Sequence, residues 1–295
     1  MVKVALIGAG YWGSKISNSL NKNKNVSEVV IIDVRNGDSI DNIPKDYTTA
    51  IIATPLWDHY ATTSKLLTRG FDCYVEKPMA ETADDCIRLQ EQAGEQILMV
   101  GHIFLYHPAL EYIKSNLFKI GKVRHVTSQR LNWGIYQKKT TPLLSLLPHD
   151  ISILLELLGT NIQVENAVGA DFNNPTQPDY VNFNLKFDNS ITANVIGSWY
   201  WPERVRKLTI IGTEGLIVWD DVQNSVVFYQ GNVVDGRLSE LNVTETHIPD
   251  LTISPLEREL NHFIESVVNR TQPKSDANNA ITVAKLIDEI ATYLH

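Results

Sequence analysis

Short apolar runs alternate with helical patterns over roughly the first 120 residues of the chain. The runs consist mainly of Val, Ile, Leu and Ala, as expected of strands buried on both faces, and lie at 2–7, 26–33, 49–55, 71–78 and 96–101. Between them, the spacing of apolar side chains predicts helices near 14–24 and 57–69, and a third that Thr82 caps. This alternation predicts an α/β domain whose doubly wound parallel sheet carries helices on both faces.

The hydrophobic period changes at about residue 122. Residues 179–187 alternate cleanly between apolar and polar side chains, which is typical of a sheet with one wet or ligand-facing side. Further strands are expected at 191–199, 206–212, 215–219 and 225–230, and helices near 255–269 and 277–294. We therefore predict an N-terminal domain over 1–121 and a C-terminal α+β domain over 122–295 with an open, mostly antiparallel sheet.

Only about fifteen residues, 34–48, separate the second expected strand from the third. A helix and a strand would ordinarily occupy such a connection in a doubly wound sheet, so they must be shortened or missing here.

A glycine-rich turn follows the first strand directly. Gly8-Ala9-Gly10-Tyr11-Trp12-Gly13 links this strand to the first helical pattern, which is the context of a dinucleotide-binding turn. Gly8 allows the tight turn, Gly10 lets the backbone approach a pyrophosphate, and Gly13 lets helix and strand pack closely. The helix N-terminus then offers unpaired N–H groups to the phosphates. The alternative is a glycine-rich surface turn, which the flanking strand and helix disfavour.

Two charged residues bear on which dinucleotide is bound. Asp33 closes the second strand and can accept hydrogen bonds from both ribose hydroxyls, which would repel a 2′-phosphate and favours NAD. Arg35 could instead pair with that phosphate, so NADP stays open.

Composition narrows the classes of function. The chain has 295 residues, 43% of them hydrophobic, and a formal net charge of −8, which disfavours nucleic acid as a partner. Its two cysteines, Cys73 and Cys86, are too few for a disulfide framework and have no metal-ligand spacing, so no metal is expected. Met1 leads straight into the first strand and no apolar stretch is long enough to cross a bilayer, so we expect a cytoplasmic protein without a membrane partner.

A lysine lies at the carboxyl end of the fourth expected strand, in Glu76-Lys77-Pro78. Ligands of open α/β sheets bind at this edge, and an ammonium there can protonate a carbonyl oxygen or, with a lowered pKa, take a proton from an alcohol. By spacing alone, a surface lysine before a proline turn is the better interpretation.

Histidines offer further candidates for proton transfer. His149 interrupts an otherwise apolar helical stretch over 143–155, where a histidine is more often a core residue, although imidazole is the commonest proton carrier near neutrality. Asp150 could orient it, but adjacent helical residues point in different directions. His102 and His107 follow the fifth strand with Tyr106 between them, and are as readily structural as substrate-binding.

Taken together, these motifs resemble the Gfo/Idh/MocA oxidoreductase family. The resemblance rests on the glycine turn, on Ala53-Thr54-Pro55 followed by His59, on Glu76-Lys77-Pro78, and on the His149 segment. The segment from Ser254 to Phe263 is similar to the closing part of the family. The chain is most similar to members that act on nucleotide-linked sugars or their acids, such as 3-dehydrogenases and 3-ketoreductases.

The resemblance implies a Rossmann domain, hydride exchange between a nicotinamide and a ring carbon of a sugar, and a homodimer or homotetramer formed through the C-terminal sheet. It implies that Lys77 is the catalytic acid/base, that His149 is its partner, and that the Lys77–Pro78 bond is cis. Cofactor contacts would come from Gly8, Gly10, Tyr11, Trp12, Gly13, Asp33, Arg35, Thr54, Pro55, His59, Glu76 and Lys77. Substrate contacts would come from His102, Tyr106, Arg130, Asn132, Trp133, Tyr136 and His149.

The chain departs from the family pattern around its histidine. Ser145, Leu147 and Ser152 stand where members usually carry an aspartate, a glycine and often a second aspartate. A carboxylate that would tune the lysine and histidine is therefore absent. Two other functions stay open: an NAD(P)-binding regulatory or sensor protein with little catalysis, and a lyase or glycosidase that oxidises its sugar only transiently.

Overall fold

The computed structural model describes residues 1–134, 139–173, 177–231, 233–234, 236–238 and 240–294. The chain forms two compact units. The first contains Met1–Tyr106 and Ile253–Lys285, and the second contains His107–Thr252 and Leu286–His295.

A parallel sheet organises the first unit. In its described residues, the strands β1 (Val2–Ile7), β2 (Val26–Ile32), β3 (Thr49–Ile52), β4 (Asp72–Glu76) and β5 (Leu98–Gly101) pair in the order β2-β1-β3-β4-β5. Every pairing is parallel. The strand order reverses between β1 and β3, and open α/β sheets bind their ligands at such a switch point, beyond the carboxyl ends of the strands.

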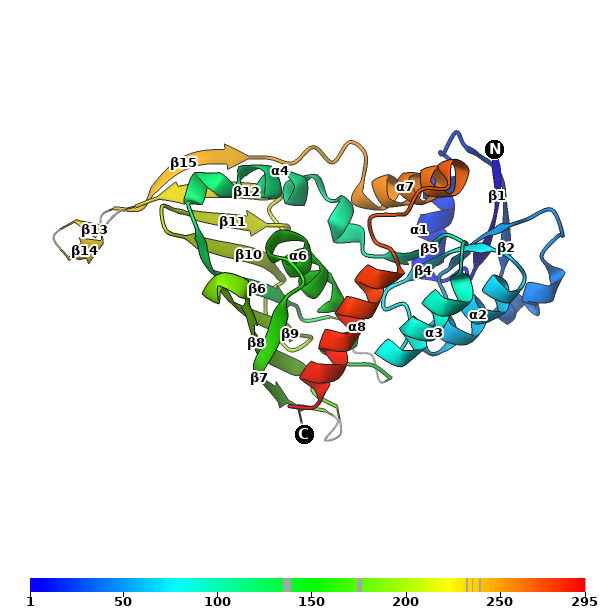
Figure 1. The fold of residues 1–295 in the computed structure, drawn as a ribbon, viewed down its shortest axis with the longest axis horizontal. Coiled ribbons are helices and arrows are strands. Elements are labelled where there is room, and N and C mark those ends of the chain that lie inside the picture. Colours follow the sequence, from blue (N-terminus) through cyan, green and yellow to red (C-terminus); the bar gives the residue numbers. More distant parts are fainter. Residues whose placement is uncertain (135–138, 174–176, 232, 235, 239, 295) are drawn as a thin grey trace. The chain divides into compact units, whose positions relative to one another are not determined.

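Helices cover both faces of this sheet (Figure 1). Right-handed crossovers that run in opposite directions from the switch point place α1 (Tyr11–Leu20) on one face and α2 (Leu56–Thr68) and α3 (Ala83–Ala93) on the other. Alternate residues of β4 divide accordingly. Cys73 and Val75 join the core beneath α2 and α3, whereas Tyr74 contacts Phe263 of α7 (Pro255–Asn269), which packs beside α1.

The connection from β2 to β3 is short, as predicted. It contains only two single turns of 3₁₀ helix, Val34–Asn36 and Ile40–Asn42, among its described residues. Side chains begin each turn by accepting a backbone N–H, Asp33 from Arg35 and Ser39 from Asp41. The usual helix and strand are therefore replaced by capped turns.

A large mixed sheet forms the second unit. Its strands pair in the order β15-β12-β11-β10-β6-β9-β8-β7, and every pairing is antiparallel except that of β6 with β9. The strands are β6 (Val123–Leu131), β7 (Ile162–Ala170), β8 (Tyr180–Phe187), β9 (Thr192–Ser198), β10 (Val205–Gly212), β11 (Leu216–Asp220), β12 (Ser225–Gln230) and β15 (Asn242–His247). A separate small hairpin joins β13 (Val233–Val234) to β14 (Arg237–Leu238).

One face of the large sheet is buried and the other is polar. Along β8, Val181, Phe183 and Leu185 are fully buried, whereas Asn182 and Asn184 alternate with them and are bridged by Asn194 of β9. The period-two pattern predicted this division. Together, the two sheets confirm the predicted fold class, a parallel α/β sheet followed by an open, mostly antiparallel one.

Short helices complete the second unit. They are α4 (Pro108–Asn116), α5 (Pro142–Ser145) and α6 (Pro148–Leu158). Instead of the one helix expected over 143–155, the chain breaks at Leu146–Leu147 and restarts at Pro148, because proline fits the first helical position, where no N–H partner is needed. Gly197 of β9 leaves room for Leu147, since a Cβ there would lie 2.7 Å from that side chain.

The C-terminal segment distributes differently from the predicted division at residue 121. Helix α7 and the first part of α8 (Ala277–Ala291) belong to the first compact unit. Ala277, Ala280 and Ile281 pack into the core beneath α2 and α3, and the backbone of Met99 pairs with that of Asp276 at the edge of the sheet. The predicted domain boundary at 121 stays a prediction.

Candidate active site

The glycine turn lies at the switch point of the parallel sheet. Gly8 has φ +96°, and a Cβ on it would lie 2.7 Å from the carbonyl oxygen of Ala53, at the end of β3. A Cβ on Gly13 would lie 2.1 Å from the carbonyl oxygen of Gly8. Gly10 differs from both, because no described atom outside Gly10 and its chain neighbours lies within 4 Å of its ideal Cβ position. Two glycines are thus needed by the fold, whereas the third leaves open space in front of the helix N-terminus.

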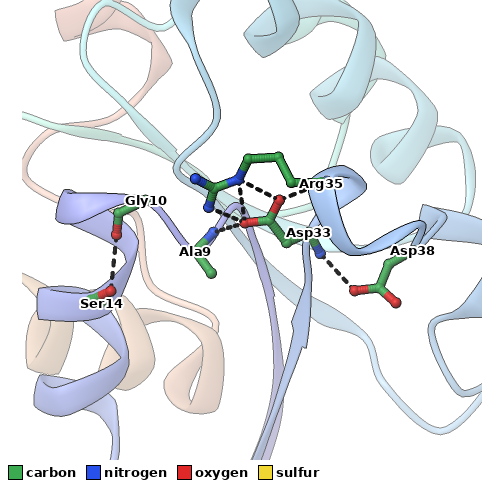
Figure 2. A network of polar contacts seen from close by, with 6 residues as sticks. All are labelled: Ala9, Gly10, Ser14, Asp33, Arg35 and Asp38. Atoms are coloured by element: carbon green, nitrogen blue, oxygen red, sulfur yellow. Dashed lines mark hydrogen bonds and ion pairs between the residues drawn. The ribbon is translucent and has the colours of Figure 1, made fainter.

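Asp33 fastens this turn to the end of β2 (Figure 2). Its carboxylate accepts a hydrogen bond of 2.9 Å from the Ala9 N–H, and Arg35 binds both carboxylate oxygens through its guanidinium. Hydrogen bonds from the Arg35 side chain and backbone, and from Ala9, hold the pKa of Asp33 well below its usual range. Asp33 is therefore an ionised acceptor whose charge a neighbouring, largely exposed arginine partly balances.

His59 holds two strand ends together. One ring nitrogen lies 2.8 Å from the carbonyl oxygen of Pro78, and the other lies 2.9 Å from that of Thr54. The ring is buried, which lowers the pKa of His59. The predicted cofactor residue thus braces the backbone after β3 and β4. The hydroxyl of Thr54 is buried without a hydrogen-bond partner in the described part of the chain, while Pro55 is exposed.

Glu76 connects the end of β4 to the glycine turn. Its carboxyl group accepts hydrogen bonds from the indole N–H of Trp12 and the hydroxyl of Tyr74. Burial raises the pKa of Glu76, against the hydrogen bond from Trp12 and the charge of Lys77. The Lys77–Pro78 bond is cis, which confirms the expectation from the family resemblance.

His102 lies directly after β5 and is 1% exposed. Neither ring nitrogen has a hydrogen-bond partner within the described ranges. Burial, with a smaller contribution from the charge of Lys77, lowers the pKa of His102 to about 3, so the ring is neutral near pH 7. Such a buried pair of unused polar atoms is what a ligand or an ordered water would complete.

Tyr106 is packed and hydrogen-bonded within the first unit. It is 7% exposed, and its hydroxyl lies 3.0 Å from that of Ser275, which itself donates to the carbonyl oxygen of Val100. The ring also contacts His262 of α7. Its predicted role in binding a substrate stays a prediction.

The remaining candidates lie in the second unit. Arg130 is buried and its Nε donates a hydrogen bond of 2.5 Å to Asp150, which also accepts one from Ser128. Asp150 is thus held by two side chains of β6, and a role for it in orienting His149 stays a prediction. His149 is half-buried at the second position of α6.

Three more substrate candidates follow β6. Asn132 is half-buried, while Trp133 is 71% exposed and packs edge-on against Tyr200 at 5.1 Å between ring centroids. Tyr136 lies outside the described residues.

Sequence reasoning did not single out two buried members of this region, Tyr74 and Glu259. The hydroxyl of Tyr74 lies 3.0 Å from Glu259 Oε2 and 3.1 Å from Glu76 Oε1. The alternation of residues along β4 could have placed Tyr74 on the same face as Glu76, but nothing local indicates that α7 supplies Glu259.

The described ranges contain neither a metal-binding cluster nor a membrane-spanning helix. No group of three or more His, Cys, Asp or Glu side chains there could hold a metal ion. None of the helices in those ranges combines the length and apolarity that a membrane span requires.

Comparison with known families agrees with this architecture. Residues 2–103 match the oxidoreductase family domain described as an NAD-binding Rossmann fold, and residues 114–218 match the GFO/IDH/MocA C-terminal domain. The chain belongs to the Gfo/Idh/MocA family of oxidoreductases. The N-terminal match confirms the predicted nicotinamide dinucleotide cofactor, because the matched domain is the family's NAD-binding one.

Individual relatives are distant. A 2,7-anhydro-N-acetylneuraminate hydratase of Mediterraneibacter gnavus is 25% identical over 253 residues, covering 74% of this chain and 67% of that protein. A UDP-N-acetylglucosamine 3-dehydrogenase of Acidithiobacillus ferrooxidans is 24% identical over 65% of this chain, which spans 61% of that protein's length. Its solved structure superposes with a TM-score of 0.84, 19% identity and coverage of 99% and 97%.

A levoglucosan dehydrogenase, solved with NADH and levoglucosan, has a TM-score of 0.81 and 18% identity, with coverage of 99% of this chain and 96% of that one. At this level of identity, the superpositions show the fold alone.

Proposed function

We propose that this protein is an NAD(P)-dependent oxidoreductase that transfers a hydride between the nicotinamide and a ring carbon of a sugar, with a nucleotide-activated sugar or sugar acid as its substrate. The observation that carries the proposal is the hydrogen bond of Trp12 with Glu76, which joins the glycine turn to the end of β4, directly before Lys77. The proposed dinucleotide site and the proposed proton carrier thus lie in the same region of the first unit.

The residues around the turn fit a dinucleotide. Gly10 leaves open space where a pyrophosphate would meet the backbone N–H groups of α1. Asp33 offers an ionised acceptor for ribose hydroxyls, which favours NAD, while the neighbouring guanidinium of Arg35 is positioned to accommodate NADP. Tyr11, Thr54, Pro55 and Glu76 complete the proposed contacts, and His59 supports them by bracing the backbone.

When bound, a nicotinamide accepts or donates the hydride at its C4 position. Lys77 is assigned the role of transferring the proton that accompanies the hydride. During oxidation its neutral amine takes the proton of the sugar hydroxyl as the C–O bond becomes C=O, and during reduction its ammonium returns that proton to the carbonyl oxygen. His102 stays neutral and offers two unused ring nitrogens near this charge, so it can orient a hydroxyl as donor or acceptor.

The second unit is expected to supply the remaining substrate contacts. Asn132, Trp133, Tyr136 and His149 are the proposed contributors, with His149 as the partner of Lys77. Arg130 is already held by Asp150, so we assign it the role of fixing the position of β6 against α6.

A sugar is favoured over other alcohols because relatives of this chain are named for sugar substrates. One relative is a dehydrogenase of UDP-N-acetylglucosamine, and a structural neighbour was solved with levoglucosan.

A second candidate function follows from the hydratase among the relatives. A hydratase adds or removes water and consumes no net oxidant, although this chain's N-terminal domain belongs to an oxidoreductase family. In such a reaction the hydride removed in a first step returns in a last one, and water is added or eliminated between them. The nicotinamide would then stay bound and no free NADH would accumulate.

Mass spectrometry of the small molecules released from the purified protein tests the proposal. We expect a nicotinamide dinucleotide, and we expect NADH absorbance to develop when NAD and nucleotide sugars are added. Product formation without a change in NADH would select the second candidate. Dinucleotide binding without turnover of any sugar would instead indicate a sensor, and the absence of dinucleotide binding would reject all three.

We also propose that the protein is a homodimer or homotetramer formed through the polar face of the large sheet. The half-buried Asn182, Asn184 and Asn194 on that face offer a regular array of amide groups to a partner. Light scattering coupled to size exclusion gives the mass, and a monomer at micromolar concentration would reject the proposal.

A further inference from the structure

Two buried carboxyl groups of the first unit share a single tyrosine hydroxyl. Tyr74 of β4 is fully buried, and its oxygen lies within hydrogen-bond distance of Glu76 at the end of the same strand and of Glu259 on α7. A tyrosine hydroxyl has one proton and can donate only one hydrogen bond. Both contacts are hydrogen bonds only if one of the two carboxyl groups is protonated and donates to the tyrosine oxygen.

The surroundings of the two carboxyl groups decide which one holds the proton. Burial raises the pKa of Glu76, but the hydrogen bond from Trp12, the charge of Lys77 and a backbone N–H all act against burial and favour its negative form. Glu259 is 0% exposed, and the groups that act on it in the described part of the chain are the negative Glu76 and the neutral Tyr74. Burial and the charge of Glu76 raise the pKa of Glu259 well above its usual range. The proton therefore belongs on Glu259.

An unused oxygen supports the same assignment. Oε1 of Glu259 is buried and has no hydrogen-bond partner in the described part of the chain. A carboxylate oxygen in that position would carry half of an uncompensated charge, whereas the carbonyl oxygen of a neutral acid is far less costly to bury.

A glycine on the neighbouring strand leaves space for the Tyr74 hydroxyl and the Glu76 carboxyl group. A Cβ on Gly101 of β5 would lie 2.6 Å from the Tyr74 hydroxyl and 3.2 Å from the carboxyl carbon of Glu76. The φ of Gly101 is not positive, so its backbone does not require glycine. Its lack of a side chain is what admits the two polar groups. On the other side, the Tyr74 ring is held against Phe263 at 5.7 Å between centroids.

We propose that Glu259 and Tyr74 are positioning residues for the end of β4, directly before Lys77. Glu259 is a neutral carboxylic acid that donates a hydrogen bond to Tyr74. Tyr74 donates to Glu76, which thereby stays a carboxylate beside Lys77. The direction of each hydrogen bond is then fixed, from α7 through β4 to the carboxylate that also accepts from the glycine turn. Among the described residues, Tyr106 is a further titratable group on which a charge on Glu259 acts. The catalytic consequence rests on the proposed function, but the protonation states do not.

Infrared spectroscopy of the protein without ligands tests the protonation states. At neutral pH we expect the carbonyl stretching band of a protonated carboxylic acid. Glu259→Gln should abolish it and still fold, because the neutral amide can donate to Tyr74 as the acid does. Glu265→Gln, on the exposed side of the same helix, is the matched control and should leave the band unchanged. Survival of the band in Glu259→Gln would overturn the proposal.

Tyr74→Phe provides a second variant that does not depend on the first. Loss of its hydroxyl should shift the frequency of the Glu259 band. It should also raise the pH at which Glu76 is half protonated by about 1–2 pH units, the equivalent of one hydrogen bond to a charged group. The infrared signal of Glu76 is assigned by its loss in Glu76→Gln. A band and a midpoint that both stay at their wild-type positions would contradict the relay.

The pH dependence of turnover tests the catalytic consequence. In Tyr74→Phe, the acid limb of the pH profile of kcat/KM should move to higher pH together with the protonation midpoint of Glu76. In Glu259→Gln, the acid limb should stay at the wild-type pH. An acid limb that is the same in all three proteins would reject the positioning role. If the bands behave as expected but no sugar is turned over, the relay stands and the proposed function fails.

Discussion

Substitution of Gly10 by alanine separates the stability of the fold from the binding of a dinucleotide. Its φ of −67° and ψ of −169° are allowed for alanine, and no described atom outside its chain neighbours lies within 4 Å of the added Cβ. The loss of glycine entropy from the unfolded chain and the poorer N-cap offset each other, so the free energy of unfolding should change by less than about 1 kcal/mol. That corresponds to a shift in Tm of at most about 4 °C.

The same methyl group lies where the backbone is expected to meet the pyrophosphate. Losing one backbone hydrogen bond to a charged phosphate costs about 1.5–3 kcal/mol, so the Kd for NAD should rise about 10- to 100-fold. Gly13→Ala is the matched control, because its Cβ would lie 2.1 Å from the carbonyl oxygen of Gly8 and the backbone itself must move. It should lower the free energy of unfolding by at least about 1–3 kcal/mol.

Thermal denaturation and calorimetric titration with NAD measure the two effects separately. Gly10→Ala should denature close to the wild-type temperature and bind NAD weakly, and Gly13→Ala should be clearly destabilised. If Gly10→Ala bound NAD with the wild-type Kd, the assignment of this turn to the pyrophosphate would be refuted.

Further substitutions have defined outcomes. Asp33→Ala removes an acceptor for the ribose and frees Arg35, so the preference for NADP over NAD, measured as the ratio of the two Kd values, should rise by about 10-fold or more. The double variant Asp33→Ala/Arg35→Ala should lose that gain. The same preference in the wild type and both variants would contradict the assignment. Lys77→Ala should lower kcat about 10²–10⁴-fold with the Kd for NAD retained, and unchanged turnover removes Lys77 from the mechanism. His102 binds a proton in the unfolded chain below about pH 6.5 but in the native protein only near pH 3, so native stability falls as the pH drops between these values. His102→Gln should flatten this dependence by up to about 1.4 kcal/mol per pH unit, and an unchanged slope in chemical denaturation would show that the ring is not buried in its neutral form.

Much of the first unit could be predicted because its determinants are local. Each parallel strand is a short apolar run, and each of the three glycines of the turn follows directly from its place between β1 and α1. The short connection over 34–48 was also predictable from length alone. The same holds for the polar face of the large sheet, since its residues alternate with period two along β8 and β9.

Features that depend on distant parts of the chain could not be predicted in this way. Glu259 lies 185 residues after Tyr74, and only the packing of α7 against β4 brings the two together. The break before His149 depends on Pro148, whose preference for a helix start overrides the continuous apolar pattern around it. The ion pair of Arg130 with Asp150 likewise requires β6 and α6 to pack together, which the sequence around either residue does not indicate.

Transfer of deuterium tests the central claim most directly. NADH that carries deuterium at C4, on either face in separate reactions, is incubated with the protein and a keto form of a nucleotide sugar, and the product is analysed by mass spectrometry. We predict one deuterium on the ring carbon that bore the ketone, from one face only, and a loss of this transfer in Lys77→Ala. A panel of keto sugars in which neither face delivers deuterium, although NADH binds, would contradict the account.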